Sequence, residues 1–234
     1  GLHRPLSAAV RGFPIAGALI GAIGGLTLMA AQSAGLPATA AAVVALLAIV
    51  LVTGGLHEDG LADVADGFGS GAEKDRKLEI MRDSRIGTYG VLALIFVVLI
   101  KVACLATIVN DAPAIWHVPV LLVATGALSR TFVVLMMHRL PAARQDGRSV
   151  EAGRPPDTAV NQSLAAGMII CAAAMWLACG WWTIIASALA GSIAYYIVKR
   201  RAMYHIGGQT GDVLGAVQQS TETAMFMAIA SVHC

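Results

Sequence analysis

The residues most able to do chemistry lie in one acidic stretch of the chain, residues 54–90. This stretch holds eight of the fourteen acidic residues and five of the sixteen lysines and arginines. Asp59, Asp63 and Asp66 recur at helical spacing, so they fall within about 60° of one another on one helix face. Carboxylate oxygens are the ligands that Mg²⁺ prefers, commonly one or two of them together with substrate phosphates. The pattern predicts a divalent-cation site, with a solvated acidic helix face as the alternative.

A second amphipathic helix is predicted for residues 73–85. Arg82 and Arg85 lie near its end, and their guanidinium groups could bind phosphate oxygens in pairs. The alternative for Arg82 is an ordinary ion pair with Glu79 inside the helix, which leaves Arg85 available.

Glycine-rich runs lie next to acidic residues at two places in the sequence. Gly67 and Gly69 follow the first acidic helix, and alternating glycines let backbone N–H groups approach a phosphate. Glycines also end helices, which is the simpler explanation. Thr210 and Asp212 follow a second run at 207–209. They suit a plain helix N-cap as well as a substrate site, and a helix N-terminus favours anions in either case.

Three basic residues outside the acidic stretch are further candidates. Arg130 lies about two turns inside an apolar stretch, where an ionisable group indicates function unless it extends back to the membrane interface. Lys101 lies deeper in another apolar stretch and is expected to face protein rather than lipid. Arg144 belongs to a basic loop, 138–156, that could meet an anionic substrate or anionic lipid headgroups.

The elements that position these residues are predicted by composition. Of the 234 residues, 57% are hydrophobic and only 13% are charged, and the mean hydropathy is +0.74. Soluble domains carry about 25% charged residues, so the chain is predicted to be an all-α integral membrane protein, a polytopic helix bundle. The net charge of +2 is too small to indicate a nucleic-acid partner.

The bundle is predicted to have about seven transmembrane helices, since a span needs about 20 mostly apolar residues. The candidate spans are residues 13–34, 36–53, 89–109, 118–137, 164–179, 181–198 and 213–231. Gly17, Gly21 and Gly25 in the first span recur every four residues, which predicts close packing against another helix.

The orientation of the bundle follows from its basic residues. Fourteen of the sixteen lysines and arginines lie before the first span or in alternate connectors, and none lies in the remaining connectors. The positive-inside rule places that basic set, with the acidic segment, in the cytoplasm. Residues 1–234 are interpreted as one membrane-embedded catalytic domain, and its N-terminus is expected to be incomplete because the chain begins at Gly1.

Three motifs carry a family resemblance. They are residues 57–66 (HEDGLADVAD), 79–87 (EIMRDSRIG) and 207–216 (GGQTGDVLGA). Together, and in this order, they resemble the cobalamin (5′-phosphate) synthase family, also called adenosylcobinamide-GDP ribazoletransferase. Residues 142–147 resemble a fourth, looser motif, whereas a Thr-Arg-x-Pro element of the family's N-terminal stretch is absent.

The resemblance implies a Mg²⁺-dependent transferase of the bacterial inner membrane that acts late in cobalamin (vitamin B12) biosynthesis. Such an enzyme joins adenosylcobinamide-GDP to α-ribazole, or to its 5′-phosphate, and releases GMP. Its partners are these two substrates and the lipid bilayer, and a homo-oligomer is left open.

With these substrates, each candidate residue is predicted to have a role. The metal ligands are Asp59, Asp63, Asp66 and Asp83, and the catalytic residues are His57, Asp59, Asp63, Arg82 and Arg85. His57 or a carboxylate is the general base, while an arginine stabilises the leaving phosphate. The substrate-binding residues are Gly67, Gly69, Arg130, Arg144, Gln209, Thr210 and Asp212.

Two other classes compete with this interpretation. CDP-alcohol phosphatidyltransferases also place helical aspartates at a membrane face, but their D-G-x-x-A-R element has arginine where this chain has Asp63. A transporter could use Lys101, Arg130 and Glu222 as relay groups inside the membrane. No internal symmetry of the kind found in transporters is visible, which argues against that class.

Overall fold

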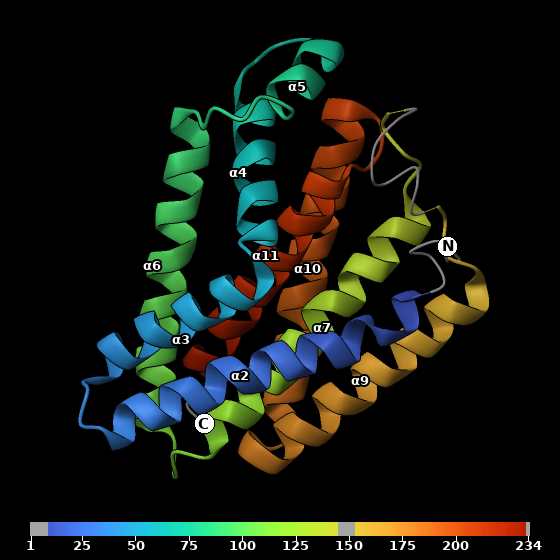
Figure 1. Cartoon of the computed structure of the whole chain (residues 1–234). Coiled ribbons are helices and arrows are strands. Elements are labelled where there is room, and N and C mark those ends of the chain that lie inside the picture. The colour runs from blue at the N-terminus through green and yellow to red at the C-terminus, as the bar shows by residue number, and fades with distance from the viewer. Residues whose placement is uncertain (1–8, 145–152, 233–234) are drawn as a thin grey trace, which may run out of the picture.

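The computed structural model describes residues 9–144 and 153–232, and the elements found there are helices, with one isolated β-bridge between Ala142 and Gln209. The helices form a single bundle (Figure 1). In chain order they are η1 (Val10–Gly12), α2 (Phe13–Ser33), α3 (Ala38–Thr53), α4 (Leu56–Gly69), α5 (Lys74–Ile80), α6 (Thr88–Asp111), α7 (His117–Arg139), α9 (Asp157–Cys179), α10 (Trp181–Ile206) and α11 (Gly211–Ser231).

Five helices in the described part of the chain are long and apolar enough to cross a membrane: α2 with η1, α6, α7, α9 and α10. The bent pair α3 and α4 makes a sixth if it counts as one span. The predicted count of seven is therefore not confirmed. Two predicted spans are affected. Helix α3 has 16 residues and qualifies only together with α4, and α11 does not qualify, its polar residues Gln218, Gln219 and Glu222 being buried inside the bundle.

The outer faces of the bundle are apolar. Leu92, Phe96 and Leu99 project outward from α6, and Leu189 and Ile193 do so from α10. A water-soluble protein rarely leaves such contiguous apolar faces exposed, whereas a bilayer solvates them. The all-α polytopic membrane fold predicted from composition is confirmed.

Helix α7 forms the centre of the bundle, since 78% of its most apolar stretch is buried. Helix α2 packs directly against it, because a Cβ added at Gly17, Gly21 or Gly25 would overlap the α7 backbone or Pro119. The close packing predicted from the glycine spacing is confirmed.

The acidic helix α4 begins at a sharp break. Gly54 and Gly55 both adopt the left-handed backbone conformation, with φ of 65° and 69°, and α3 and α4 meet at a bend of 91°. Residues with a Cβ avoid this conformation, so the glycine pair allows the turn. Helix α4 then packs along α11 and α6, and is built into the bundle rather than lying in a separate loop.

The second acidic helix is shorter than predicted. Helix α5 ends at Ile80, so Arg82, Asp83 and Arg85 lie in the irregular connection to α6. The Asp83 carboxylate accepts a hydrogen bond from the backbone N–H of Arg85 at 3.1 Å. A local turn of this kind offers the backbone an alternative to the helix, which explains the early end.

Candidate active site

The first and third motifs meet where α4 crosses α11. A Cβ added at Gly60 would lie 2.8 Å from the carbonyl oxygen of Asp212, and one added at Gly215 would lie 3.1 Å from that of His57. Since both crossing positions are glycine, the two helix backbones approach closely. The crossing brings Asp212 beside the acidic face of α4, although about 150 residues separate them in sequence.

Three carboxylates form the centre of the site: Asp59, Asp63 and Asp212. Asp59 is exposed, whereas Asp63 and Asp212 are half-buried. The negative charges of Asp212, Asp59 and Asp66 all act on Asp63, and among positive groups Arg144 acts on it. Repulsion between like charges at such spacing is relieved by a bound cation.

The fit of these carboxylates to Mg²⁺ follows from their chemistry. Among the described residues, no three His, Cys, Asp or Glu side chains are grouped so that together they could hold a metal ion. Mg²⁺ does not require such a group, since it commonly takes one or two carboxylates and completes its shell with substrate phosphates and water. Asp59, Asp63 and Asp212 are the carboxylates from which one or two such ligands could come, and metal binding here stays a prediction.

Asp66 lies on the same helix but has other partners. Its Oδ2 accepts a hydrogen bond from the backbone N–H of Gly87 at 2.7 Å, and its Oδ1 accepts one from Gly90 at 2.8 Å. Because Gly87 and Gly90 begin α6, Asp66 caps that helix and ties it to the end of α4. Sequence reasoning missed this role, and the predicted role of Asp66 as a metal ligand remains untested.

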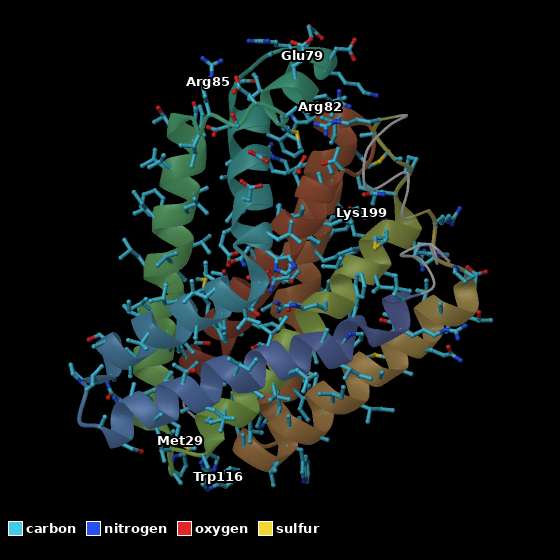
Figure 2. All side chains as sticks on the ribbon, viewed as in Figure 1. Met29, Glu79, Arg82, Arg85, Trp116 and Lys199 are labelled. Atoms are coloured by element: carbon cyan, nitrogen blue, oxygen red, sulfur yellow. The ribbon has the colours of Figure 1, made fainter. Side chains whose placement is uncertain are left out.

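The two candidate arginines of the second motif have different surroundings. Arg85 is bound to Asp83, with Nη2 2.7 Å from Oδ2, and this pair holds the pKa of Asp83 down at about 2. The Arg85 side chain is 87% exposed and points outward from the end of the bundle (Figure 2). Arg82 instead acts electrostatically on Asp212. Arg82 is therefore the better-placed of the two, and Asp83 is engaged in the outward pair.

Arg144 joins the site from the loop after α7. Its Nη1 lies 4.0 Å from Oδ2 of Asp212, and its Nη2 donates to the Leu78 carbonyl at 2.8 Å. Thr210 donates to the same Asp212 carboxylate at 3.1 Å and accepts the backbone N–H of Val213 at 3.4 Å. Thr210 is thus the N-cap of α11, while Asp212 faces Arg144.

Other predicted site residues have structural contacts instead. Gly67 and Gly69 both lie within α4, where added Cβ atoms would overlap Met81 and the ring of Tyr89. A phosphate-binding role for these glycines gains no support from this packing. His57 lies about 160° around the helix from Asp59. It is influenced by the charges of Arg130, Glu222 and Lys101, on the side away from the acidic face.

Arg130 is a member of a buried ion cluster. It is 5% exposed, and its Nη1 lies 3.1 Å from Oε1 of Glu222. Lys101, 4% exposed, lies 2.7 Å from the other oxygen of Glu222 and also donates to Gln219. The expectation that Lys101 faces protein is confirmed. The contacts of Arg130 explain its burial without a substrate, and its predicted role in substrate binding remains untested.

The fold and the site define a class: a polytopic α-helical membrane protein with an acidic, arginine-flanked site where α4 crosses α11. Residues 3–230 match the cobalamin-5-phosphate synthase family, and the chain belongs to that family. No solved structure gives a significant match.

Similar proteins in three bacteria are named adenosylcobinamide-GDP ribazoletransferase. The protein of Azorhizobium caulinodans is 44% identical over 92% of this chain and 81% of its own length. That of Bradyrhizobium diazoefficiens is 43% identical over 93% and 81%. That of Mesorhizobium japonicum is 42% identical over 98% and 85%. Membership of this transferase family argues against the phosphatidyltransferase and transporter interpretations.

Proposed function

We propose that this protein is a transferase that joins adenosylcobinamide-GDP to α-ribazole, or to α-ribazole 5′-phosphate, and releases GMP. The names of the relatives supply the substrates. The observation that carries the proposal is the meeting of α4 and α11, which sets Asp59 and Asp63 beside Asp212 with Arg144 opposite. Carboxylates flanked by arginines are suited to a diphosphate held with a divalent cation.

The reaction is a phosphoryl-group displacement. The ribazole hydroxyl oxygen attacks the phosphorus attached to the cobinamide, forming a new P–O bond. The P–O bond to the second phosphate breaks, and GMP leaves with that electron pair. The hydroxyl proton passes to a carboxylate of the site rather than to His57, because His57 lies on the other side of α4. Such a transfer depends mainly on positioning and on neutralising charge.

Each charged residue has a part in this step. Asp59, Asp63 and Asp212 would hold Mg²⁺, which, when bound, neutralises the diphosphate and polarises its phosphorus. Arg144 and Arg82 stabilise the charge that develops on the departing GMP phosphate. The apolar faces of α6 and α10 keep the site at a fixed depth in the bilayer.

The localisation is part of the same proposal: the bacterial inner membrane, with the acidic end of the bundle in the cytoplasm. The asymmetry of lysine and arginine between alternate connectors supports it. Trp116 and Met29 lie at the end of the bundle opposite Glu79, Arg82 and Arg85 (Figure 2). A tryptophan at that end suits the opposite membrane interface.

The deciding experiment uses the purified protein in detergent with adenosylcobinamide-GDP and α-ribazole. We expect GMP release that requires both substrates and stops when Mg²⁺ is chelated. Failure to release GMP, or release of CMP from a CDP-linked substrate instead, would overturn the proposal.

A further inference from the structure

A cavity of about 340 Å³ opens beside the acidic site, between the end of α7 and the loop that precedes α11. Its lining includes His138, Arg139, Arg154 and Gln209. The cavity and the acidic site are close along the chain, because Gln209 lines the cavity and Asp212, three residues later, belongs to the acidic site.

Gln209 gives this cavity an unused hydrogen-bonding group. The residue is only 4% exposed, and its side-chain Oε1 has no hydrogen-bond partner among the described residues. Its backbone is fixed independently of the side chain, since its N–H donates to Pro141 at 2.8 Å and its carbonyl accepts from Ala143 at 2.9 Å. A buried amide without a partner is costly unless a ligand supplies one.

The described residues that line the cavity carry positive charge. Arg139 and Arg154 are exposed, and neither forms an ion pair with a carboxylate of the described residues. His138 is already engaged, with Nε2 3.3 Å from Asp157 and Nδ1 3.2 Å from the Pro155 carbonyl. Among the described residues that line the cavity, none is acidic. Guanidinium groups bind phosphates and also stack on aromatic rings, so the lining suits an anionic ligand with a planar ring.

The volume of the cavity indicates which part of the proposed substrates it could bind. Ligand sites usually enclose about 300–1,000 Å³, so a cavity of about 340 Å³ suits a nucleoside better than the much larger corrinoid ring. Guanine has ring and amino N–H groups, and these can donate hydrogen bonds to a buried amide oxygen. The alkylated benzimidazole of α-ribazole has no N–H that could donate such a hydrogen bond.

We infer that this cavity binds the guanosine part of the donor substrate. The Gln209 amide oxygen accepts a hydrogen bond from a guanine N–H, and Arg139 and Arg154 lie against the base and its phosphate. The diphosphate then extends past Gln209 toward Arg144 and Asp212. The inference rests on the proposed function for the identity of the donor, but binding of guanosine monophosphate can be measured without turnover.

The test is calorimetric binding of GMP and AMP to the full chain in nanodiscs of neutral lipid. The wild-type protein is expected to prefer GMP, because adenine carries no ring N–H at the matching position. Gln209→Leu should weaken GMP binding about tenfold, the effect of one lost hydrogen bond to a buried acceptor, and leave AMP binding unchanged. Gln162→Leu, the same change at an exposed position of α9, is the matched control.

Steady-state kinetics distinguish an effect on the donor substrate from an effect on the acceptor. Gln209→Leu should raise KM for adenosylcobinamide-GDP and leave KM for α-ribazole unchanged. Equal affinity of the wild-type protein for GMP and AMP, unchanged GMP binding in the variant, or a higher KM for α-ribazole alone would each overturn the inference. So would GMP binding that an anionic lipid, phosphatidylglycerol, abolishes by competition.

A second variant covers the case in which Gln209→Leu does not fold. Arg139→Gln with Arg154→Gln changes only exposed side chains and should weaken GMP binding while making it less dependent on salt. Unchanged GMP binding in that double variant contradicts the inference. If GMP binds as expected but no transfer occurs with any acceptor, the proposed function fails and the nucleotide site stands.

Discussion

At the scale of single residues, Asp63 is surrounded by other negative charges. Asp59 and Asp66 act on it from the same helix, and Asp212 acts on it from α11. Asp63→Asn keeps the size of the side chain and removes one charged ligand. We expect GMP release to fall at least about 100-fold and the Mg²⁺ concentration for half-maximal activity to rise. Steady-state assays over a Mg²⁺ titration measure both.

Asp75→Asn is the matched control, since Asp75 is an exposed acid of α5 with no part in the site. Its activity and Mg²⁺ dependence should equal those of the wild-type protein. Equal losses in the two variants would mean that the activity responds to net charge and not to Asp63.

The two arginines after α5 should differ in effect. Arg82→Gln removes a positive charge that acts on Asp212, and we expect turnover to fall about tenfold. Arg85→Gln should cost far less, because that guanidinium is exposed and bound to Asp83. A larger loss from Arg85→Gln than from Arg82→Gln would show that the connection closes over the substrate in another arrangement.

The Arg85–Asp83 pair also has a defined pH dependence. The pKa of Asp83 is lowered from 3.8 to about 2 in the folded protein. The pair is therefore complete above about pH 4 and is lost as the pH falls through 2. Arg85→Gln should return the Asp83 pKa toward 3.8, which NMR of ¹³C-labelled aspartate side chains can follow.

At the scale of the helices, the crossing of α4 and α11 depends on glycine. A Cβ at position 60 would press on the Asp212 backbone, which cannot move aside as a flexible side chain would. Gly60→Ala should therefore separate Asp59 and Asp63 from Asp212 and lower turnover more than it lowers the unfolding temperature. Gly12→Ala, where an added Cβ meets nothing within 4 Å, should change neither. Normal turnover in Gly60→Ala would contradict the proposed crossing site.

A substitution at Asp66 tests whether this predicted metal ligand instead stabilises the fold. Asp66→Asn can accept only one of the two hydrogen bonds from the start of α6. We expect the free energy of unfolding to fall by about 1–2 kcal/mol, with the Mg²⁺ dependence of turnover unchanged. Thermal unfolding in detergent and a Mg²⁺ titration separate these roles. A weakened Mg²⁺ dependence at normal stability would restore Asp66 to the metal site.

These helices also show what could be predicted from the sequence. Helical periodicity predicted the shared face of Asp59 and Asp63, and the glycine spacing predicted the contact of α2 with α7. The partners of Asp66 could not be predicted, because they depend on how the chain returns after α5. The 91° break before α4 escaped prediction too, since a Gly-Gly pair is compatible with many turns.

At the scale of the whole molecule, buried charge links three helices. Glu222 of α11 binds Lys101 of α6 and Arg130 of α7, and all three side chains are at most 6% exposed. The sequence grouped Lys101, Arg130 and Glu222 as charged residues inside the membrane, but it could not predict that they contact one another, since Glu222 is about 90 to 120 residues away from the two cations. Only the tertiary structure brings the charges together. The cluster joins α11 to α6 and α7, and we expect it to help hold Asp212, on the same helix, in position.

Removing Glu222 should be the most damaging change to stability. Glu222→Gln leaves two buried cations without their counter-charge, and breaking a buried ion pair in this way costs about 3–5 kcal/mol. Equilibrium unfolding in mixed detergent measures the loss, and Glu73→Gln, at an exposed position, is the control. Replacing all three charged residues by methionine should recover much of the stability, because no uncompensated charge remains buried. Turnover should recover less, since apolar contacts do not fix the position of α11 along its neighbours as two ion pairs do. Full activity in the triple variant would show that the cluster stabilises the bundle without positioning Asp212.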